Sequence, residues 1–498
     1  MMNKNNKSAK PDNAIQSPHE NAEVGIKLNK KTMIIISLLL FAIMVFAGVL
    51  TQVMPRGEYQ TQMLDGHESI INGTYTEIDY TMPIWKIILA PILVFASSEA
   101  TTGLAIILFI VLIGGTFLIL DKVGALKYIM SVIIKKFGSR KYLLLAIMVF
   151  VCMLLSSTAG ILEESVTLVP IAVAISLALG WDSFVGLGIS LFSIAFGFTA
   201  ATFNPFNVMT VQKLAGLEVF SGLWLRIIVF AAVYAVLTGY LIVYAKKIEK
   251  HPEKSLSYEN DKQLRRKFSL DESDALLSDP AVRKATRSFV FCLCGVLLFI
   301  VLDFILEAGG MISLPAMALL FTAGGLLAGY NAGLRGKKLA KSFGAGIKSI
   351  APALPLIIFV IAISYILKEG KIIHTILNFV YNIVSGFNPY QSILLLFLFV
   401  VVLEFFIGSG TAKAFLIMPL VAPLADLVGV TRQSVVLSFC LGDGFTNLLY
   451  PTSGIMIIAI GLVGVSYGKW LRWSLKLFML EGLISIGFML LAVAVNYH

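Results

Sequence analysis

Short runs of hydroxyl, amide and charged side chains interrupt long apolar stretches at four places in the chain. Hydroxyl and amide groups can hold a small ligand reversibly, while free N–H groups at a helix start attract carboxylates and free carbonyl groups attract cations. These residue types therefore indicate binding and release rather than bond-breaking chemistry. The candidate binding residues are Ser156, Ser157, Thr158, Glu163 and Glu164 in the first run; Thr199, Thr202, Asn204 and Asn207 in the second; Ser409, Gly410, Thr411 and Lys413 in the third; and Asp443, Thr446, Asn447, Thr452 and Ser453 in the fourth.

At membrane depth each charged residue in these runs costs about 2.5–3.5 kcal/mol and is a functional candidate for that reason. Three acids, Glu163, Glu164 and Asp443, stand against one base, Lys413. A site with this excess of acid would take a proton, a cation or a positively charged substrate. In the alternative interpretation Lys413 pairs with Asp443 and one glutamate faces solvent, because adjacent residues lie about 100° apart on a helix. Glu404, about one turn before the third run, is a candidate fourth partner.

The composition predicts that lipid surrounds most of the chain. The 498 residues are 58% hydrophobic and 14% charged, and the mean hydropathy is +0.87, whereas about 25% of the residues in soluble proteins are charged. The net charge is +10, but Lys and Arg lie between the apolar stretches, a distribution that sets orientation in a membrane rather than nucleic-acid binding. We therefore expect an all-α polytopic protein of the plasma or inner membrane, in contact with the lipid bilayer and with no nucleic acid.

The sequence predicts no enzyme. It contains no Walker motif, nucleophile elbow, zinc motif or dinucleotide fingerprint, and the spacing of its four cysteines fits no metal site. We expect no cofactor other than a coupling ion, either a proton or sodium. If sodium binds, its candidate ligands lie near Ser157, Asn204, Ser409 and Asn447.

Charge and apolar length together predict the topology. Residues 1–31 are polar and have little to bury, so we expect a disordered cytoplasmic tail. Residues 55–82 are acidic and contain the turn pairs Asp65-Gly66 and Asn72-Gly73, which predict a small external β-hairpin. The basic segment 246–287 is a cytoplasmic linker. The apolar stretches give about nine full crossings, with the N-terminus in the cytoplasm and the C-terminus outside.

The two halves of the chain repeat one pattern in opposite orientations. In each half a polar tip joins two apolar segments that are short for full spans, which predicts a re-entrant helical hairpin, and a segment broken by Pro, Gly and Asn follows, which predicts a broken transmembrane helix. The predicted units are a first repeat at 32–245, with hairpin 142–180 and broken helix 184–216, and a second, inverted repeat at 288–498, with hairpin 391–428 and broken helix 434–465.

Inverted repeats with discontinuous helices are typical of secondary transporters. Backbone polar groups without partners cost several kcal/mol each in lipid, so four matched interruptions indicate one central polar cavity. We therefore expect a secondary active transporter. A channel is less favoured, because tips that enter from opposite sides form an occluded site rather than an open pore.

Over about residues 30–495 the chain resembles the YfcC-like carriers of the ion-transporter superfamily, which are described both as C4-dicarboxylate anaerobic carriers and as basic amino acid antiporters. The resemblance is strongest at SSTAGILEESVTLVP, GFTAATFNPFNV, GSGTAKAFLIMPL and LGDGFTNLLYPTSG. It implies a scaffold domain, a mobile transport domain holding both hairpins, a homodimer and an elevator-like cycle. Related sodium-coupled dicarboxylate carriers have Ser-Asn-Thr at the hairpin tips, whereas these tips read Ser156-Ser157-Thr158 and Gly408-Ser409-Gly410-Thr411.

The charges of the four runs favour a basic amino acid as the substrate. A dicarboxylate would need a positive site, and Lys413 is outnumbered by acids. The carboxylate of arginine or ornithine would meet half-helix N–H groups and hydroxyls, and its cationic group would meet Glu163, Glu164 or Asp443. The alternative is a carrier for C4-dicarboxylates or another small carboxylate, coupled to sodium or to protons that the acids bind.

Overall fold

The computed structural model describes residues 30–64, 67–97, 100–162, 165–267, 277–305, 313–351, 354–384 and 386–498. The expected tail at 1–31 lies almost entirely outside these residues. The Asp65-Gly66 turn, Glu163 and Glu164 also lie outside them, so the structure does not test those predictions.

Most of the described chain is helical, as the composition predicts. The first half contains α1 (Lys30–Val53), α2 (Ile84–Ile88), α3 (Ala90–Leu93), η1 (Val94–Ala96), α4 (Ala100–Lys122), α5 (Ala125–Phe137), η2 (Gly138–Arg140), α6 (Lys141–Ala159), α7 (Ser165–Ala178), α8 (Ser183–Leu187), η3 (Gly188–Phe192), α9 (Ser193–Thr199), η4 (Pro205–Met209), α10 (Thr210–Leu214) and α11 (Leu223–Lys250). The rest contains η5 (Pro252–Lys254), α12 (Tyr258–Lys267), α14 (Pro280–Ile305), α15 (Ser313–Asn331), α16 (Lys337–Ile350), α17 (Leu354–Glu369), α18 (Ile373–Val384), α19 (Pro389–Phe406), α20 (Gly410–Leu427), α21 (Arg432–Asp443), η7 (Phe445–Leu448), α22 (Gly454–Val463) and α23 (Tyr467–Ala494).

Several of these helices match the thickness of a bilayer. By length and composition, five helical stretches of the described residues could cross a membrane: Ala125–Ala159, Leu223–Lys250, Pro389–Phe406, Gly410–Leu427 and Tyr467–Ala494. About 20 residues of helix span the hydrocarbon layer, and the outward side chains of these helices are largely apolar. The fold is therefore that of a multi-pass membrane protein.

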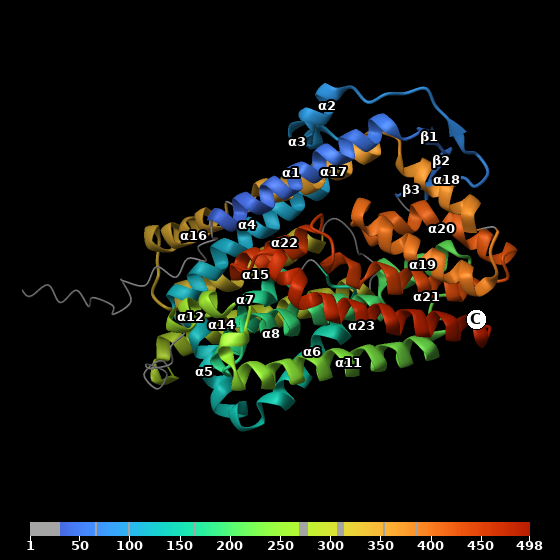
Figure 1. The fold of residues 1–498 in the computed structure, drawn as a ribbon. Helices are drawn as coiled ribbons and strands as arrows, with labels where there is room; N and C mark the ends of the chain where they lie inside the picture. The colour runs from blue at the N-terminus through green and yellow to red at the C-terminus, as the bar shows by residue number, and fades with distance from the viewer. Residues whose placement is uncertain are drawn as a thin grey trace, which may run out of the picture.

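A β-hairpin is present within residues 55–82, where the sequence predicts one. β1 (Gly57–Glu58) pairs antiparallel with β4 (Thr76–Glu77), and β2 (Thr61–Leu64) pairs antiparallel with β3 (His67–Ile70), one ladder nested inside the other. This hairpin lies at the same end of the molecule as the last residue, whereas α12 and α16 lie at the opposite end (Figure 1). The strand β3 packs against α20.

Both predicted helix breaks are confirmed. In the first half α9 ends at Thr199, residues 200–204 are not helical, and a π-helical turn, η4, starts at Pro205. In the second half α21 ends at Asp443, the short 3₁₀ turn η7 follows, and α22 begins only at Gly454. Pro205 has no N–H to continue a helix, so the first break follows directly from the sequence.

The same packing pattern occurs in both halves of the chain. In the first half α6 packs against α9 and α11, and α5 packs against α7. In the second half α19 packs against α21 and α23, and α18 packs against α20. Helices at corresponding places in the two halves of the chain thus have corresponding neighbours.

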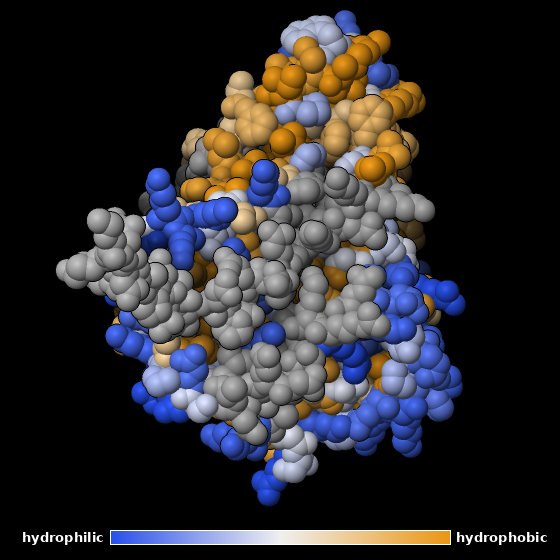
Figure 2. Space-filling view, turned by 90° about the vertical axis from the view of Figure 1, so that its left-hand side faces the viewer, coloured by the Kyte–Doolittle hydropathy of each residue, from blue (hydrophilic) through white to orange (hydrophobic). Residues whose placement is uncertain are grey.

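Two basic segments between apolar stretches contain helices. The basic connection at 333–349 forms α16, which packs along α4, and the linker at 246–287 contains α12. In α16, Leu339, Phe343 and Ile347 recur on one face among the charges, a period that permits a helix on the protein surface. The end of the molecule that holds α12 and α16 is viewed in Figure 2, where hydrophilic residues gather over the lower part and hydrophobic residues over the upper part.

Candidate functional site

Three charged side chains meet in the interior, beside the second break. The Lys413 ammonium is bonded to the Glu404 carboxylate and lies 2.7 Å from Asp443 Oδ1. All three side chains are buried. Ion pairs at this depth survive only where the charges satisfy one another. The pairing of Lys413 with Asp443 and the role of Glu404 as a further partner, both foreseen from the sequence, are therefore confirmed.

The first break reaches the same carboxylate. Asn207, in the π-helical turn η4, donates from Nδ2 to Asp443 Oδ2 at 3.3 Å and accepts from the Cys440 thiol at 3.1 Å. Gly444 lies so close to the first break that a Cβ on it would come 2.2 Å from the Thr199 backbone nitrogen. The two interruptions, which are more than 200 residues apart in the sequence, thus touch each other at Asp443.

The first polar tip is bonded to the first break. The Ser157 hydroxyl donates to the Ala200 carbonyl at 2.7 Å and lies 3.0 Å from the Thr202 hydroxyl. The Ser157 carbonyl accepts from the backbone N–H groups of Thr202 and Phe203 at 2.9 and 3.1 Å. The non-helical backbone at 200–203 therefore takes partners from the tip, as interrupted backbone in a membrane requires.

The second polar tip also reaches the first break. Thr411 donates from its hydroxyl to the Phe206 carbonyl at 3.0 Å. Gly410 brings the start of α20 against the charged cluster, because a Cβ there would lie 2.6 Å from Asp443 Oδ2. Both tips and both breaks consequently converge on one region around Asn207 and Asp443.

Several predicted site residues act on the backbone of the break itself. Thr446 and Asn447 donate to carbonyl groups at the end of α21, Gly442 O at 2.5 Å and Asp443 O at 2.8 Å. Ser409 and Ser453 cap the starts of α20 and α22, and Asn204 caps η4. These side chains fix the ends of half-helices and leave ligand contact to backbone groups and neighbours.

The remaining predicted residues occupy less central places. Thr158 donates to the Leu154 carbonyl of its own helix, Thr199 donates to the Ala195 carbonyl, and Thr452 is half-buried. Ser156 is fully buried, and its hydroxyl has no hydrogen-bond partner among the described residues.

The sequence reasoning missed Cys440. Its spacing from the other cysteines excludes a metal site, and no spacing rule links a lone cysteine to an asparagine 233 positions away. Among the described His, Cys, Asp and Glu residues, no group of three or more could hold a metal ion.

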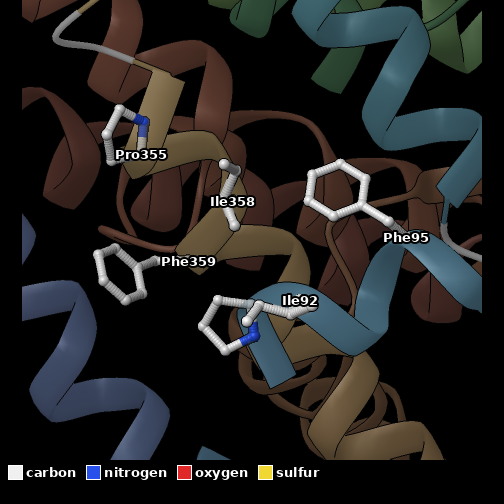
Figure 3. Close-up of a pocket in the computed structure, with 6 residues that line it drawn as sticks. Ile92, Phe95, Pro355, Ile358 and Phe359 are labelled. Atoms are coloured by element: carbon white, nitrogen blue, oxygen red, sulfur yellow. The ribbon is translucent and has the colours of Figure 1, made fainter. Parts of the chain in front are cut away.

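A groove of about 500 Å³ lies elsewhere, between α3, η1 and α17. Ile92 and Phe95 face Ile358 and Phe359 across it, with Pro355 nearby (Figure 3). Its lining residues are all apolar and lie among exposed apolar side chains. The groove is a lipid-facing surface feature and is separate from the charged site.

Comparison with known proteins decides the family. The DcuC family, described as C4-dicarboxylate anaerobic carrier, matches residues 33–494. The chain belongs to this family of carriers. The family match spans both interruptions and the whole charged site, so the protein is a membrane transporter and not an enzyme.

Two curated proteins are similar over most of their length. The chain is 31% identical to "Putative basic amino acid antiporter YfcC" of Escherichia coli (strain K12) over 422 residues, which cover 81% of this chain and 80% of YfcC. It is 26% identical to an uncharacterized protein of Haemophilus influenzae over 393 residues, 79% of this chain and 76% of that protein.

Two solved transporters are similar in structure at low sequence identity. The YdaH transporter of Alcanivorax borkumensis has a TM-score of 0.41 at 13% identity, covering 94% of this chain and 98% of its own. MtrF of Neisseria gonorrhoeae, from a class of antimetabolite efflux pumps, has a TM-score of 0.41 at 16% identity, covering 93% and 94%.

Proposed function

We propose that this DcuC-family protein is a secondary active carrier of basic amino acids, of the arginine or ornithine type. One observation carries the proposal: two buried carboxylates, Glu404 and Asp443, converge on a single ammonium, Lys413. One acid is thus left without a cation of its own. A cationic substrate supplies the missing charge, whereas a dicarboxylate adds two more negative charges to a site that already has an excess.

The neighbouring groups suit the other end of an amino acid. Ser157, Thr202 and Thr411 bring hydroxyl groups to the two tips and the first break. Ser409 and Ser453 stand at the starts of α20 and α22, where N–H groups face outward from the helix. The three hydroxyl groups donate to the Ala200, Ser157 and Phe206 carbonyls in this conformation. The N–H groups at the helix starts would therefore bind the substrate carboxylate, and the hydroxyls would join them by turning away from these carbonyls.

The proposal includes alternating access by an elevator-like movement. The repeated packing pattern supports two inverted repeats, each with a re-entrant hairpin and a broken helix, in about nine full crossings. The N-terminus would lie in the cytoplasm and the C-terminus outside, in a plasma or inner membrane. A homodimer would provide the fixed scaffold, and sodium or a proton would be the coupling ion.

A C4-dicarboxylate carrier is the second candidate, favoured by the family description and by Lys413, whose ammonium could bind a carboxylate. In that case Glu404 or Asp443 would carry a proton during the cycle, which would remove the excess negative charge. This alternative makes the opposite prediction for substrate selectivity.

Uptake into proteoliposomes separates the two candidates. Vesicles containing the purified full-length protein and loaded with ornithine are given labelled arginine or labelled succinate. We expect ornithine-dependent uptake of arginine and none of succinate. Uptake of succinate without uptake of arginine would exclude the basic amino acid carrier.

A further inference from the structure

A second buried acid lies in the membrane, apart from the charged site. Glu481 is in the middle of α23, a helix of 28 residues, and its side chain has no exposed surface. Neither of its carboxyl oxygens has a hydrogen-bond partner among the described residues. An ionised carboxylate in such surroundings is prohibitively costly, so in this conformation the group is neutral and holds a proton.

A purely structural carboxylic acid would place its O–H and its C=O on neighbouring groups, because buried polar atoms are normally paired. Glu481 does not, although two further hydroxyls without partners among the described residues, those of Ser485 and Ser438, are also buried. Ser485 follows Glu481 by four residues on the buried face of α23. A carboxyl group and a hydroxyl one turn apart, both buried and without hydrogen-bond partners among the described residues, indicate a site whose hydrogen bonds change during function.

The helix α21 packs against α23, which contains Glu481. The two helices run antiparallel, since Thr431 donates to the Tyr497 carbonyl at one end and Trp470 donates to the Leu448 carbonyl at the other. The start of α21 is therefore level with the end of α23, and Ser438 lies with residues of α19 and α20 around it. The helix α21 ends at Asp443 of the charged site, so α21 connects the two places mechanically.

The charged and titratable groups around α23 are already engaged elsewhere. α11, α19, α21 and α22 pack against α23, and α22 contains no titratable residue. On α11, α19 and α21 the buried or half-buried titratable groups have other partners. These groups, each followed by its partner, are Arg226 (Ser221 O), Tyr234 (Ala146 O), Tyr240 (Trp473 O), Tyr244 (Asp182), Glu404 and Asp443 (Lys413), and Cys440 (Asn207). None of these bonds is to Glu481, and no Lys or Arg of the described residues forms an ion pair with it.

We propose that Glu481 is a proton-binding site, and that it couples transport to proton movement; the coupling rests on the proposed carrier function. The carboxylate takes one proton from a hydronium ion on one side of the membrane, forming an O–H bond and leaving water, and it is buried in the neutral form described here. A conformational change that parts α21 from α23 exposes the acid to water on the other side. The O–H bond then breaks, and the proton passes to water.

The test compares Glu481→Gln, which keeps the shape but cannot titrate, with a matched control, Glu369→Gln, at a partly exposed glutamate at the end of α17. Full-length wild type and both variants are reconstituted with a pH-sensitive dye inside the vesicles. We expect E481Q to lose proton movement and uptake driven by a pH gradient, while it retains arginine–ornithine exchange. The control should keep all three.

A second readout does not depend on the substrate. Infrared spectra of the purified proteins at neutral pH should contain a protonated carboxylic C=O band in wild type and E369Q that is absent from E481Q. The absence of that band from wild type, or proton movement by E481Q equal to that of wild type, would overturn the proton site. If wild type transports no arginine but has the band, the proposed substrate fails and the proton site stands.

Glu481→Asp serves if E481Q does not fold. It keeps an acid but shortens the side chain by one methylene, which changes its surroundings and its affinity for the proton. We expect E481D to retain proton-driven uptake with a displaced pH profile. A profile identical to that of wild type would contradict the assignment.

Discussion

At the residue scale, Lys413 is the residue on which the charged site depends. Its ammonium is the partner of two buried carboxylates, and each carboxylate would be uncompensated without it. Breaking a buried ion pair by removing one partner costs far more than the pair contributes, because the remaining charge keeps its desolvation penalty. Lys413 is therefore required for folding as well as for the proposed substrate site.

Lys413→Met should lower stability by about 3–5 kcal/mol, since it leaves Glu404 and Asp443 buried side by side. Thermal unfolding in detergent measures the effect as a large fall in Tm. Addition of Asp443→Asn should recover part of the loss, because only one acid then remains.

Arg432→Met is the matched control for this prediction. It breaks the pair between Arg432 and Asp426, whose side chains are 38% and 50% exposed, and such surface pairs contribute about 0–1 kcal/mol. Equal Tm values for K413M and R432M would contradict the structural role of Lys413.

Two adjacent serines at the first tip should respond differently to alanine. Ser157→Ala removes the donor to the Ala200 carbonyl and should cost about 1–3 kcal/mol, because that buried carbonyl loses its partner. Ser156→Ala removes a buried hydroxyl without a partner among the described residues and should be neutral or stabilising. Tm values of the two variants in one detergent decide the matter; a greater loss for S156A would contradict the account.

The sequence allowed most of these residues to be predicted, but not their bonds. Ionisable groups at membrane depth are conspicuous in a sequence, which identifies Lys413 and Asp443, and Glu404 lies one turn away from the tip. Cys440 could not be foreseen, because its partner Asn207 comes from the other half of the chain. Contacts across such distances depend on how the helices pack, and no local pattern records that.

At the element scale, the interruptions of the helices follow most directly from the sequence. Pro205 and the Gly and Asn residues around it forbid a continuous helix, so the break at 200–204 follows from local chemistry. The helix α16 lies in a basic segment, 333–349. The charge of a segment indicates on which side of the membrane it lies but not its secondary structure. The 3.6-residue period of its apolar residues indicates a helix.

Asp182, in the turn between α7 and α8, forms a hydrogen bond with the linker. This residue lies outside the membrane-spanning segments. The Asp182 carboxylate accepts from the Tyr244 hydroxyl at 2.6 Å and the Ser255 hydroxyl at 2.7 Å. Asp261 of α12 accepts from the Ser183 backbone N–H at 3.0 Å. Burial raises the pKa of Asp182 from its ordinary value of 3.8 to about 6.

The raised pKa of Asp182 should make the stability of the protein depend on pH. Between pH 3.8 and about 6 the folded state retains a proton on Asp182 that the unfolded state has released, so stability falls as pH rises through that window. Asp182→Asn removes the titration. As pH rises from 4 to 7, wild type should therefore lose roughly 3 kcal/mol of unfolding free energy relative to D182N. The Tm of wild type should fall relative to that of D182N over the same range.

Exposed Asp279→Asn is the control for this pH series. Its Tm should follow that of wild type at every pH. A Tm difference between D182N and wild type that stays constant across the series would show that Asp182 does not titrate in this window.

At the scale of the whole molecule, the charged site exists because two distant halves of the chain meet. Two hydrogen bonds join the halves of the chain. Asn207 donates to Asp443, and Thr411 donates to the Phe206 carbonyl. The sequence predicted this convergence from the matched interruptions, since polar backbone in lipid must share a cavity. It did not predict which helices pack together, because the apolar faces of membrane helices are chemically alike.

The proposed orientation predicts opposite labelling of two single cysteines in a background without native cysteine. Asn496→Cys, exposed after α23, should react with a membrane-impermeant maleimide in intact cells. Lys250→Cys, exposed at the end of α11, should react only after permeabilisation. Labelling of both positions in intact cells, or of neither, would contradict termini on opposite sides.

The most direct test of the central claim, that the tips and breaks form one acidic substrate site, is equilibrium binding of labelled arginine to the purified protein. Wild type should bind arginine and release it to excess ornithine but not to excess succinate. Asp443→Asn should weaken binding at least about tenfold, or 1.4 kcal/mol, while Asp426→Asn, which removes an exposed acid of the same helix pair, should bind like wild type. Displacement by succinate, or undiminished binding by D443N, would contradict the account.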